Sequence, residues 1–421
     1  MATGKHHRPL RKLTAKGLRT RNELLGCASL AFEEYGYFAT SVSEIGRRCG
    51  VSQGTFYQYF SNKEEIFREL VDRVLADFWQ KVNQNQGDSQ DFYSRLNAGV
   101  GVLLEHCSQH QALHRILNEF ELIDILTIGY YESMARYFRD FFRQAANQGH
   151  LRHLDPNVVA YSLIGMAIFH YMDWGPDSDR YNQAELTQMT ADLLLGGIAS
   201  DTPWEIPSRL GVSAFPETLG APFAWADDDT QANPTRNSIF QAAEKVIGKN
   251  GYHGASIAEI TRRAGVAQGT FYVHFNSKQD LMQGVVRHLS RELRHNLRQA
   301  TERVNDRRLQ EQEGIVAFFR FLENHSQIYR VVAECETIGR ETGLWYYRKL
   351  AVGYQDTLAQ GVSQGELRPF PPAFLARSLM GLNHMIGLKW LVWNSAPGAK
   401  VSEQTIEDTI FLVLFGLSSN A

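Results

Sequence analysis

The sequence predicts an all-α protein that contains two similar helical units in tandem. The stretch "GVSQGTFYQYF", from Gly50 to Phe60, returns almost unchanged as "GVAQGTFYVHF", from Gly265 to Phe275, 215 positions later. Apolar residues recur at three- and four-residue steps over long segments, as in "YYESMARYFRDFFRQAANQG", and strand-like alternation is nowhere sustained. We therefore expect helices throughout and an internal duplication.

The duplication extends far beyond that phrase. The segment "TRNELLGCASLAFEEYGY" from Thr20 aligns without a gap with "TRNSIFQAAEKVIGKNGY" from Thr235. Further on, "GHLRHLDPNVVAYSLIGM" from Gly149 aligns with "GELRPFPPAFLARSLMGL" from Gly365 at an offset of 216. A unit of nearly 200 residues is therefore repeated, and 421 residues are enough for two such units.

Helix start signals surround the repeated phrase. Ser41 and Ser256 are each followed three residues later by a glutamate, which is the pattern of a capping box. Asn62 and Ser277 precede an acidic residue at the same spacing. Between these signals a short helix, a turn at Gly50 and a second short helix are expected, which is helix-turn-helix architecture.

The second helix of such a motif enters the major groove of DNA. Gln53 and Thr55 place hydrogen-bonding groups near its N-terminus, where base edges lie, and Gly54 allows close approach of the backbone. Tyrosine and lysine further along are suited to phosphates. The predicted DNA-binding residues are Ser43, Gln53, Gly54, Thr55, Tyr57, Tyr59 and Lys63 in the first copy, and Gln268, Gly269, Thr270, Tyr272, His274 and Lys278 in the second. The phenylalanines between them, Phe56, Phe60, Phe271 and Phe275, are expected in the core.

Both copies resemble the DNA-binding domain of the TetR family of transcriptional regulators. The matching pattern runs from "TRN" and "GY" through the repeated phrase to "SNKEE" and "NSKQD", and it covers Thr20 to Val74 and Thr235 to Leu289. "GHLRHLDP" resembles the start of a later helix of that family less specifically. The resemblance implies that each unit has an N-terminal three-helix helix-turn-helix domain and a C-terminal helical bundle for ligand binding and dimerisation.

Members of that family are usually homodimers that read two half-sites, and most are repressors released by a small ligand. This chain departs from the pattern because it carries two units. We expect an intramolecular pseudo-dimer that binds a double-stranded DNA operator with imperfect inverted symmetry, and further association of two chains is left open. The expected domains are 1–75 with a basic arm, 76–199, a linker at 200–233, 234–290 and 291–421.

Charge is segregated along the chain, whose net charge is −3. Residues 1–74 hold 12 Lys and Arg against 8 Asp and Glu, and residues 234–289 hold 7 against 3. Both DNA-binding segments are therefore basic in an acidic chain, as phosphate contact requires. The basic arm contains Lys5, Arg8, Arg11, Lys12, Lys16, Arg19 and Arg21, and either contacts DNA or is a solvated tail.

The C-terminal bundles are expected to enclose a small-molecule effector of apolar or aromatic character. Aromatic residues of these bundles are more often core than lining, so the two readings stay open. The candidate ligand-binding residues are Phe120, Glu121, Tyr130, Met134 and Tyr137 in the first unit and Glu336, Trp345, Tyr347 and Tyr354 in the second.

Two further residue groups have alternative interpretations. His106, His110 and His114 share one helical face and are able to bind a transition metal, but Phe321 and Tyr329 in the second copy favour an apolar face, and we predict no metal site. The four cysteines have no paired spacing, which argues against a disulfide framework and structural zinc; we expect small buried side chains, with a redox-sensing thiol as the alternative. They are Cys27, Cys49, Cys107 and Cys335.

We predict a cytoplasmic, ligand-responsive transcriptional regulator, most readily a repressor, with no cofactor. No basic leader with an apolar segment is present, and the apolar run Ile410 to Leu417 is far shorter than a membrane span. No catalytic motif supports an enzyme. The alternative is a ligand-binding or protein-interaction scaffold whose helix-turn-helix motifs no longer bind DNA, which would not need the same Gln, Gly, Thr, Tyr and Lys in both copies.

Overall fold

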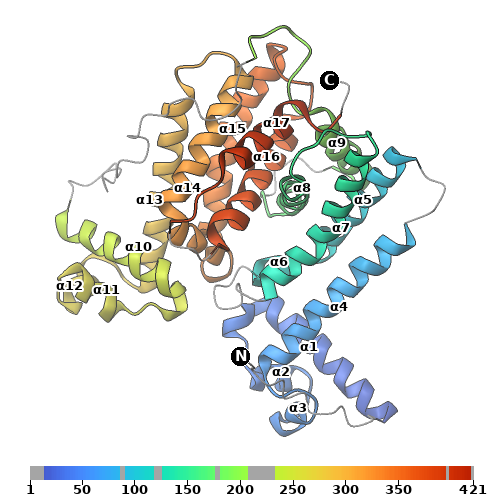
Figure 1. Ribbon diagram of the computed structural model, residues 1–421. Coiled ribbons are helices and arrows are strands. Elements are labelled where there is room, and N and C mark those ends of the chain that lie inside the picture. Colours follow the sequence, from blue (N-terminus) through green and yellow to red (C-terminus); the bar gives the residue numbers. More distant parts are fainter. Residues whose placement is uncertain are drawn as a thin grey trace. The chain divides into compact units, whose positions relative to one another are not determined.

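The computed structural model is helical, as the sequence predicts (Figure 1). It describes residues 14–85, 91–117, 126–175, 181–206, 233–394 and 398–418. In these ranges the only β-type pairings are two isolated antiparallel bridges, Leu151 with Ser418 and Ala199 with Leu367. No helix in the same ranges combines the length and the apolar character that crossing a bilayer requires. The all-α fold class and the tandem units are confirmed.

The chain divides into two compact parts, Met1–Ala76 and Asp77–Ala421, and each is described by itself. The N-terminal part contains α1 (Ala15–Ala39), α2 (Val42–Arg48), α3 (Gln53–Tyr59) and the first turns of α4 (Lys63–Gln84). Gly36 lies inside α1 with φ of 78°, a left-handed conformation that glycine adopts without strain, and it bends the chain toward α2. The Ser41 side chain accepts a hydrogen bond from the Glu44 N–H at 3.1 Å, so the predicted cap forms.

The main part begins within α4 and continues with the remaining helices of the first copy. These are α5 (Phe92–Gln109), α6 (Gln111–Leu117), α7 (Ile128–Asn147), α8 (Pro156–His170) and α9 (Gln183–Gly196). On α7, Tyr130, Met134 and Phe138 are buried on one face, as their spacing predicts. By contrast, nearly every residue of α8 is buried, which shows that this helix is covered on all sides.

The second copy repeats the same order of helices in the main part. Its helices are α10 (Pro234–Gly254), α11 (Ile257–Ala264), α12 (Gln268–His274), α13 (Lys278–Thr301), α14 (Arg307–Ile338), α15 (Arg340–Ser363), α16 (Pro372–Gly387), the short π-helix η3 (Leu388–Val392) and α17 (Glu403–Phe415). Gly251, with φ of 72°, bends α10 as Gly36 bends α1. His325 has non-helical dihedral angles inside α14, and it corresponds to His110, where α5 ends. The second copy therefore has a kink where the first copy has a break between two helices.

The two copies meet where α8 crosses α16, and glycine makes the close approach possible. A Cβ atom on Gly165 would lie 2.0 Å from the Gly381 carbonyl oxygen, and a Cβ on Gly381 would lie 2.2 Å from the Gly165 oxygen. These two glycines occupy equivalent positions at the offset of 216. Each copy therefore presents the same residue to the other, which is the signature of a two-fold-related contact.

A second set of reciprocal contacts joins the segments that follow α9 and α17. The Ile198 N–H donates to the Val413 carbonyl at 2.8 Å, and the Leu417 N–H donates to the Leu194 carbonyl at 2.9 Å. Each of these pairs maps onto the other when 219 is added to the residues of the first copy. Gly197 and Gly416 have φ of 63° and 67°, and a Cβ on either would collide with backbone of the other copy. Equivalent residues of the two copies thus make the same backbone hydrogen bond in both directions.

The first residues of the predicted linker pack against the second copy. The Ser200 N–H donates to the Glu366 carbonyl at 3.0 Å, the Trp204 ring lies 6.1 Å from the Phe415 ring, and the Arg308 guanidinium lies 4.6 Å from the Trp204 ring centre. Residues 207–232 of the linker lie outside the described ranges. The described start of the linker therefore follows the surface of the second copy.

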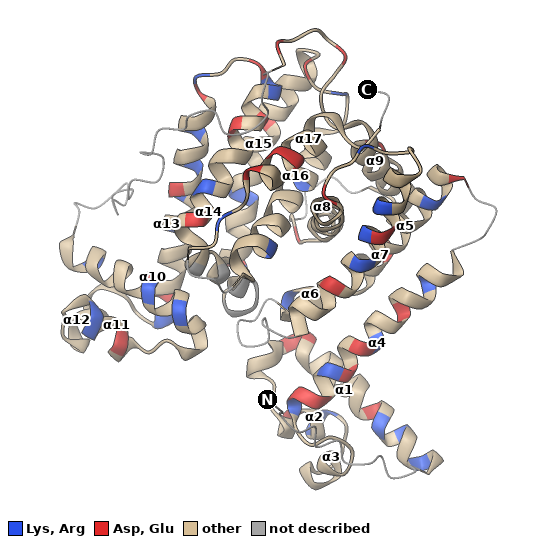
Figure 2. Cartoon of the chain, in the orientation of Figure 1, with Lys and Arg blue, Asp and Glu red and all other residues tan. Residues whose placement is uncertain are grey.

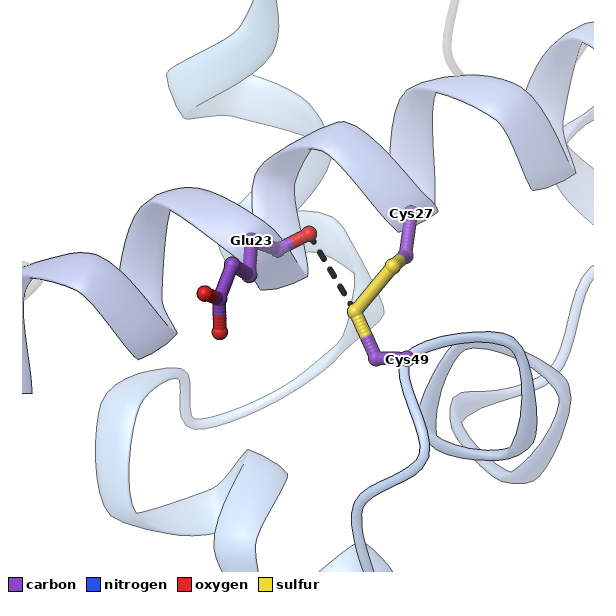
Figure 3. Close-up of a disulfide and its surroundings, with 3 residues drawn as sticks. All are labelled: Glu23, Cys27 and Cys49. Atoms are coloured by element: carbon purple, nitrogen blue, oxygen red, sulfur yellow. Dashed lines mark hydrogen bonds between the residues drawn. A yellow bond between two sulfur atoms is a disulfide. The ribbon is translucent and has the colours of Figure 1, made fainter.

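The expectation that all four cysteines are buried, unpaired side chains is wrong for two of them. Cys27 on α1 and Cys49 at the end of α2 form a disulfide bond (Figure 3). Both are half-exposed, and the Cys49 Sγ lies 3.2 Å from the Glu23 carbonyl oxygen. Their pairing depends on how α1 and α2 cross, which residue spacing does not reveal. Cys107 and Cys335 are buried and belong to no disulfide bond, as predicted.

Candidate DNA-binding surfaces and ligand cavity

Polar contacts hold the N-terminus of the first recognition helix, α3, in place. Ser52 caps this helix, since its Oγ accepts a hydrogen bond from the Thr55 N–H at 3.2 Å and lies 3.1 Å from the Thr55 Oγ1. The Gln53 Nε2 donates to the Ser43 Oγ on α2. Gly50 supplies the positive φ of the turn, 67°. The predicted base-reading residues Gln53 and Thr55 thus lie together, and both reach the surface.

The second recognition helix, α12, has the same length and fewer polar contacts. Ala267 takes the place of Ser52, so no side chain caps this helix. Gln268 is exposed and Thr270 is half-exposed, like their counterparts in α3. Val273, which replaces Gln58, is 78% exposed. An apolar side chain with that exposure is suited to thymine methyl groups rather than to hydrogen-bonding base edges.

The glycine after each leading glutamine is not required by packing. A Cβ on Gly54 would meet only the Ser52 Oγ, at 3.6 Å, and a Cβ on Gly269 would meet nothing within 4 Å. Glycine inside a helix costs about 1 kcal/mol relative to alanine. Close approach of another molecule to these backbones would explain why both helices carry glycine here.

Aromatic residues of the two recognition helices divide into core and surface. Phe56 and Phe271 are completely buried, as expected. Tyr57 and Tyr272 are 50% and 56% exposed, and the next positions on this surface, Tyr59 and His274, are half-buried. The two tyrosines at 57 and 272 are therefore available to phosphates, and the difference between Tyr59 and His274 makes the two surfaces chemically distinct.

The structure assigns Lys63 and Lys278 an intramolecular role that the sequence did not reveal. The Lys63 Nζ donates to the Tyr37 and Thr40 carbonyls at 2.6 and 2.8 Å, with the Phe38 carbonyl at 3.4 Å. The Lys278 Nζ donates in the same way to carbonyls at the end of α10, at 2.7 and 2.8 Å. An ammonium group has three N–H donors, so the phosphate contact predicted for Lys63 requires that it give up a backbone acceptor.

Both α2 and α11 have two arginines in their last turn, and Figure 2 colours the basic residues of the chain blue. The two copies differ in the ion pairs that these arginines form. Arg47 and Arg48 form ion pairs with Glu44 and Glu34. A hydrogen bond from the Tyr35 hydroxyl, followed by the interaction with Arg48, lowers the pKa of Glu34. The counterparts Arg262 and Arg263 are exposed and have no carboxylate within 4.0 Å in the described part of the chain. From the predicted basic arm, Lys16, Arg19 and Arg21 belong to α1, and residues 1–13 lie outside the described ranges.

A cavity of about 540 Å³ lies in the second copy between α13, α14, α15 and α16, with Phe169 of α8 in its wall. Its interior is largely apolar, and Arg294, Arg298 and Lys349 line it as well. None of these three cations has a carboxylate partner within 4.0 Å among the described residues. Burial, followed by repulsion from neighbouring arginines, lowers the pKa of Arg294. The apolar residues of the wall include Leu293, Ile315, Phe318 and Leu350.

Deeper in the cavity, polar atoms divide into those already paired and those without a partner. Arg307 pairs with Glu311, and the Tyr329 hydroxyl lies 2.6 Å from the His384 Nδ1. Burial lowers the pKa of His384 to about 3, so this imidazole is neutral. The Tyr346 hydroxyl and the Asn383 Oδ1 are buried and have no hydrogen-bond partner among the described residues. They are therefore the atoms best placed to bind a ligand's polar group.

The predicted ligand residues are distributed unevenly around this cavity. Tyr347 and Tyr354 line it, whereas Trp345 does not. In the first copy Tyr130 and Met134 are core residues, and Tyr137 is half-buried against Phe78 and Trp79. Phe120 and Glu121, and the side chain of Glu336, lie outside the described residues.

Sequence reasoning missed the arginines of the cavity. Arg294 and Arg298 line the cavity, and together with Arg291 they recur at three- and four-residue steps on α13, which places all three on one face. This spacing in the sequence indicates a basic face on the helix. What sequence did not indicate is that part of this face turns toward the bundle interior.

A model of a family described as "Bacterial regulatory proteins, tetR family" matches residues 27–70 and 239–285, which contain both helix-turn-helix motifs. The uncharacterised regulator YhgD of Bacillus subtilis is 25% identical over 156 residues, 36% of this chain and 82% of YhgD. The transcriptional activator FasR of Mycolicibacterium smegmatis is 37% identical over 99 residues, 24% of this chain and 45% of FasR.

Among solved structures, the fatty acid degradation regulator FadR from Bacillus halodurans aligns with 44% of this chain and 98% of its own, with 22% identity and a TM-score of 0.37. The family match falls on the two segments whose structures repeat each other, α1 to α4 and α10 to α13. The chain belongs to the TetR family of bacterial regulatory proteins and carries two of its units in tandem.

Proposed function

We propose that this chain is a ligand-responsive repressor in which the two units form an intramolecular pseudo-dimer on one operator. The observation that supports it most is the reciprocal contact of Gly165 with Gly381, repeated by the paired hydrogen bonds after α9 and α17. A contact between equivalent residues is what a homodimer of single units makes across its two-fold axis. Here equivalent residues of a single chain contact each other, which supports the proposed pseudo-dimer.

The operator should be an imperfect inverted repeat. Conventional dimers read two identical half-sites because their recognition helices are identical. In this chain Ser43 corresponds to Ala258 and Gln58 to Val273, so the first copy offers more hydrogen-bonding groups around a shared Gln-Gly-Thr core. Each base pair read differently should change the binding free energy by about 1 to 3 kcal/mol.

The effector should combine an apolar body with an anionic group. Arg294 and Arg298 supply positive charge at the cavity, its wall is apolar, and Tyr346 and Asn383 offer unpaired polar atoms inside. A fatty acid or an acyl thioester of coenzyme A has this chemistry. Occupation of the cavity would favour one arrangement of α13 and α15. Because only three residues separate α13 from the recognition helix α12, ligand binding would shift the population of DNA-competent chains.

The decisive experiment measures how many chains bind one operator. DNA selected from a random library by the full chain is used to compare the selected site with its two symmetrised versions, and the molar mass of the complex is measured in solution. We expect one chain per operator and at least about fivefold weaker binding to one of the symmetrised sites, equivalent to ~1 kcal/mol. Two chains per operator, or equal affinity for all three sites, would contradict the pseudo-dimer. Failure to select DNA would favour the scaffold alternative.

The effector class is tested by displacement of the selected DNA with a fatty acid, its coenzyme A thioester and the corresponding uncharged alcohol. Arg294→Met should weaken the effect of the anionic ligands about tenfold and spare the alcohol. Arg136→Met, on the exposed face of α7, is the matched control. Equal potency of all three ligands would argue against the anionic site. We expect the protein to act in the cytoplasm, where bacterial DNA lies, and to have no enzymatic activity.

A further inference from the structure

Three potential metal ligands gather in the first copy, at the point where α4 lies beside α5. The ligand atoms of Asp77 on α4, His106 on α5 and His110 at the end of α5 all lie within 4.8 Å of one another. The sequence grouped His106 and His110 with His114 by helical spacing, but the structure replaces His114 with an aspartate from another helix. All three residues belong to the same compact part of the chain.

His106 has the environment of a metal-binding imidazole. The residue is completely buried, and its Nε2 lies 2.7 Å from the Tyr130 hydroxyl. Its Nδ1 is buried and has no hydrogen-bond partner among the described residues. When the Nε2–H donates to the tyrosine oxygen, the Nδ1 carries the free lone pair. Metal-binding histidines are commonly held in this way, with the second ring nitrogen donating to an oxygen.

His110 adds a second nitrogen without a partner. Its Nε2 is buried and makes no hydrogen bond to the described residues, and its ring centre lies 4.8 Å from that of His106. Buried polar atoms are nearly always satisfied in proteins, so two unpaired imidazole nitrogens side by side require an explanation. A cation bound between them would satisfy both.

The second copy shows that the fold does not need these residues for packing. Phe321 takes the place of His106, so an apolar ring fills that position in an otherwise similar bundle. His325 takes the place of His110 and lies between the carboxylates of Glu244 and Glu292, 3.4 and 3.5 Å away. The imidazole there has anionic partners, whereas the first copy has a pair of imidazoles and one carboxylate.

We propose that Asp77, His106 and His110 bind a divalent transition-metal ion, with zinc as the best match. Two imidazole nitrogens and one carboxylate oxygen suit zinc, cobalt or nickel, whereas magnesium and calcium prefer oxygen ligands. Neighbouring ligand atoms of tetrahedral zinc are about 3.4 Å apart, so the cluster must contract by side-chain rotation, and the half-exposed Asp77 has room to rotate. The fourth position would be taken by water.

Lys81 is the competing cation at this site. Its Nζ lies 3.2 Å from the Asp77 carboxylate, but also 2.9 Å from the Glu105 carboxylate and 2.7 Å from the Gln109 oxygen. If Asp77 turns to the metal, Lys81 keeps two acceptors. Metal binding therefore does not leave this ammonium group unpaired.

Bound metal would fix α4 to α5. α4 runs without interruption from Lys63, which follows the first recognition helix, to Gln84 in the regulatory bundle. Restraint of its second half should therefore change DNA affinity, and DNA should change metal affinity by the same factor. This consequence rests on the proposed function, whereas the metal site itself does not.

The test is a calorimetric titration of the full, untagged chain with Zn²⁺ after treatment with a chelator, together with the absorption spectrum of the Co²⁺ form. We expect one high-affinity ion per chain. His106→Phe, which installs the residue of the second copy, and Asp77→Asn should each weaken this ion at least about tenfold. His150→Ala, an exposed histidine on the same copy, should leave it unchanged.

Equal zinc affinity in the wild type, His106→Phe and Asp77→Asn would overturn the site and show weak surface binding only. Circular dichroism in the presence of chelator checks that the variants fold. If His106→Phe does not fold, Asp77→Asn is sufficient for the test, because Asp77 is half-exposed and its substitution does not disturb the core. Binding of the selected operator with and without Zn²⁺ then measures the coupling. Zinc binding without DNA binding would refute the proposed function and leave the metal site standing.

Discussion

His325 should make the stability of the second copy depend on pH in the alkaline range. Its imidazole lies at the kink of α14, with the Nδ1 3.4 Å from Glu244 on α10 and the Nε2 3.5 Å from Glu292 on α13. Burial by itself would lower its pKa, but the hydrogen bonds and charges of the two glutamates prevail and raise the pKa to about 9. The neighbouring His288 is kept neutral because burial lowers its pKa to about 4.

The magnitude follows from the difference between this pKa and the ordinary histidine value of 6.5. A raised pKa in the folded state means that folding takes up a proton, so the stabilisation is complete below pH ~6.5 and is lost as the pH rises through about 9. The linkage relation gives about 3 kcal/mol of stabilisation at pH 6.5 and less than about 1 kcal/mol at pH 9.5. The side chain is only 14% exposed, so screening by solvent is limited.

The assay is urea unfolding of the full chain between pH 6.5 and 9.5, compared with His325→Gln, whose side chain does not titrate. The free energy of unfolding of the wild type minus that of the variant should fall by about 3 kcal/mol across this range. His150→Gln is the control and should show no such difference. A wild-type advantage that is the same at both ends of the range would refute the ion pair as the source of the stabilisation.

Three further outcomes are expected from other parts of the structure. Gly165→Ala should destabilise the chain by about 3 kcal/mol in urea unfolding, because its Cβ would lie 2.0 Å from a backbone oxygen of the second copy. Gly54→Ala and Gly269→Ala should leave the fold intact, or stabilise it by up to ~1 kcal/mol, and should weaken binding of selected DNA in a fluorescence anisotropy titration. Reduction of the Cys27–Cys49 disulfide should lower the stability of the N-terminal part by about 3 kcal/mol, and the double alanine variant should lose its response to reductant in thermal melts.

The local features of each unit follow from the sequence because they depend on residues three or four positions apart. Ser41 and Ser256 cap helices where their spacing to glutamate predicts it. The buried face of α7 follows from its periodicity, and Gly50 and Gly265 have the positive φ values that a turn between two short helices requires. The duplication, the all-α class and the family are readable for the same reason, since they rest on contiguous stretches of the chain.

The role of a charged or polar side chain depended on partners far away in the sequence. Lys63 is the right residue for a phosphate, but its ammonium group reaches carbonyls 23 to 26 residues earlier, at the end of α1. Cys27 and Cys49 have no paired spacing, and the crossing of α1 and α2 brings them together.

Sequence by itself determined that this chain has two helical units, each with a recognition helix whose exposed and buried positions are distinguishable. Only the tertiary structure decided which side chains lie close together. Asp77, and not His114, completes the group with His106; arginines of α13 line a cavity; and Gly165 contacts Gly381. The physical reason is the distance along the chain between the residues that interact. Caps, turns and helical faces arise from interactions within one or two turns of chain, whereas a binding site or an interface depends on distances of a few ångströms between helices, set by the packing of the whole bundle.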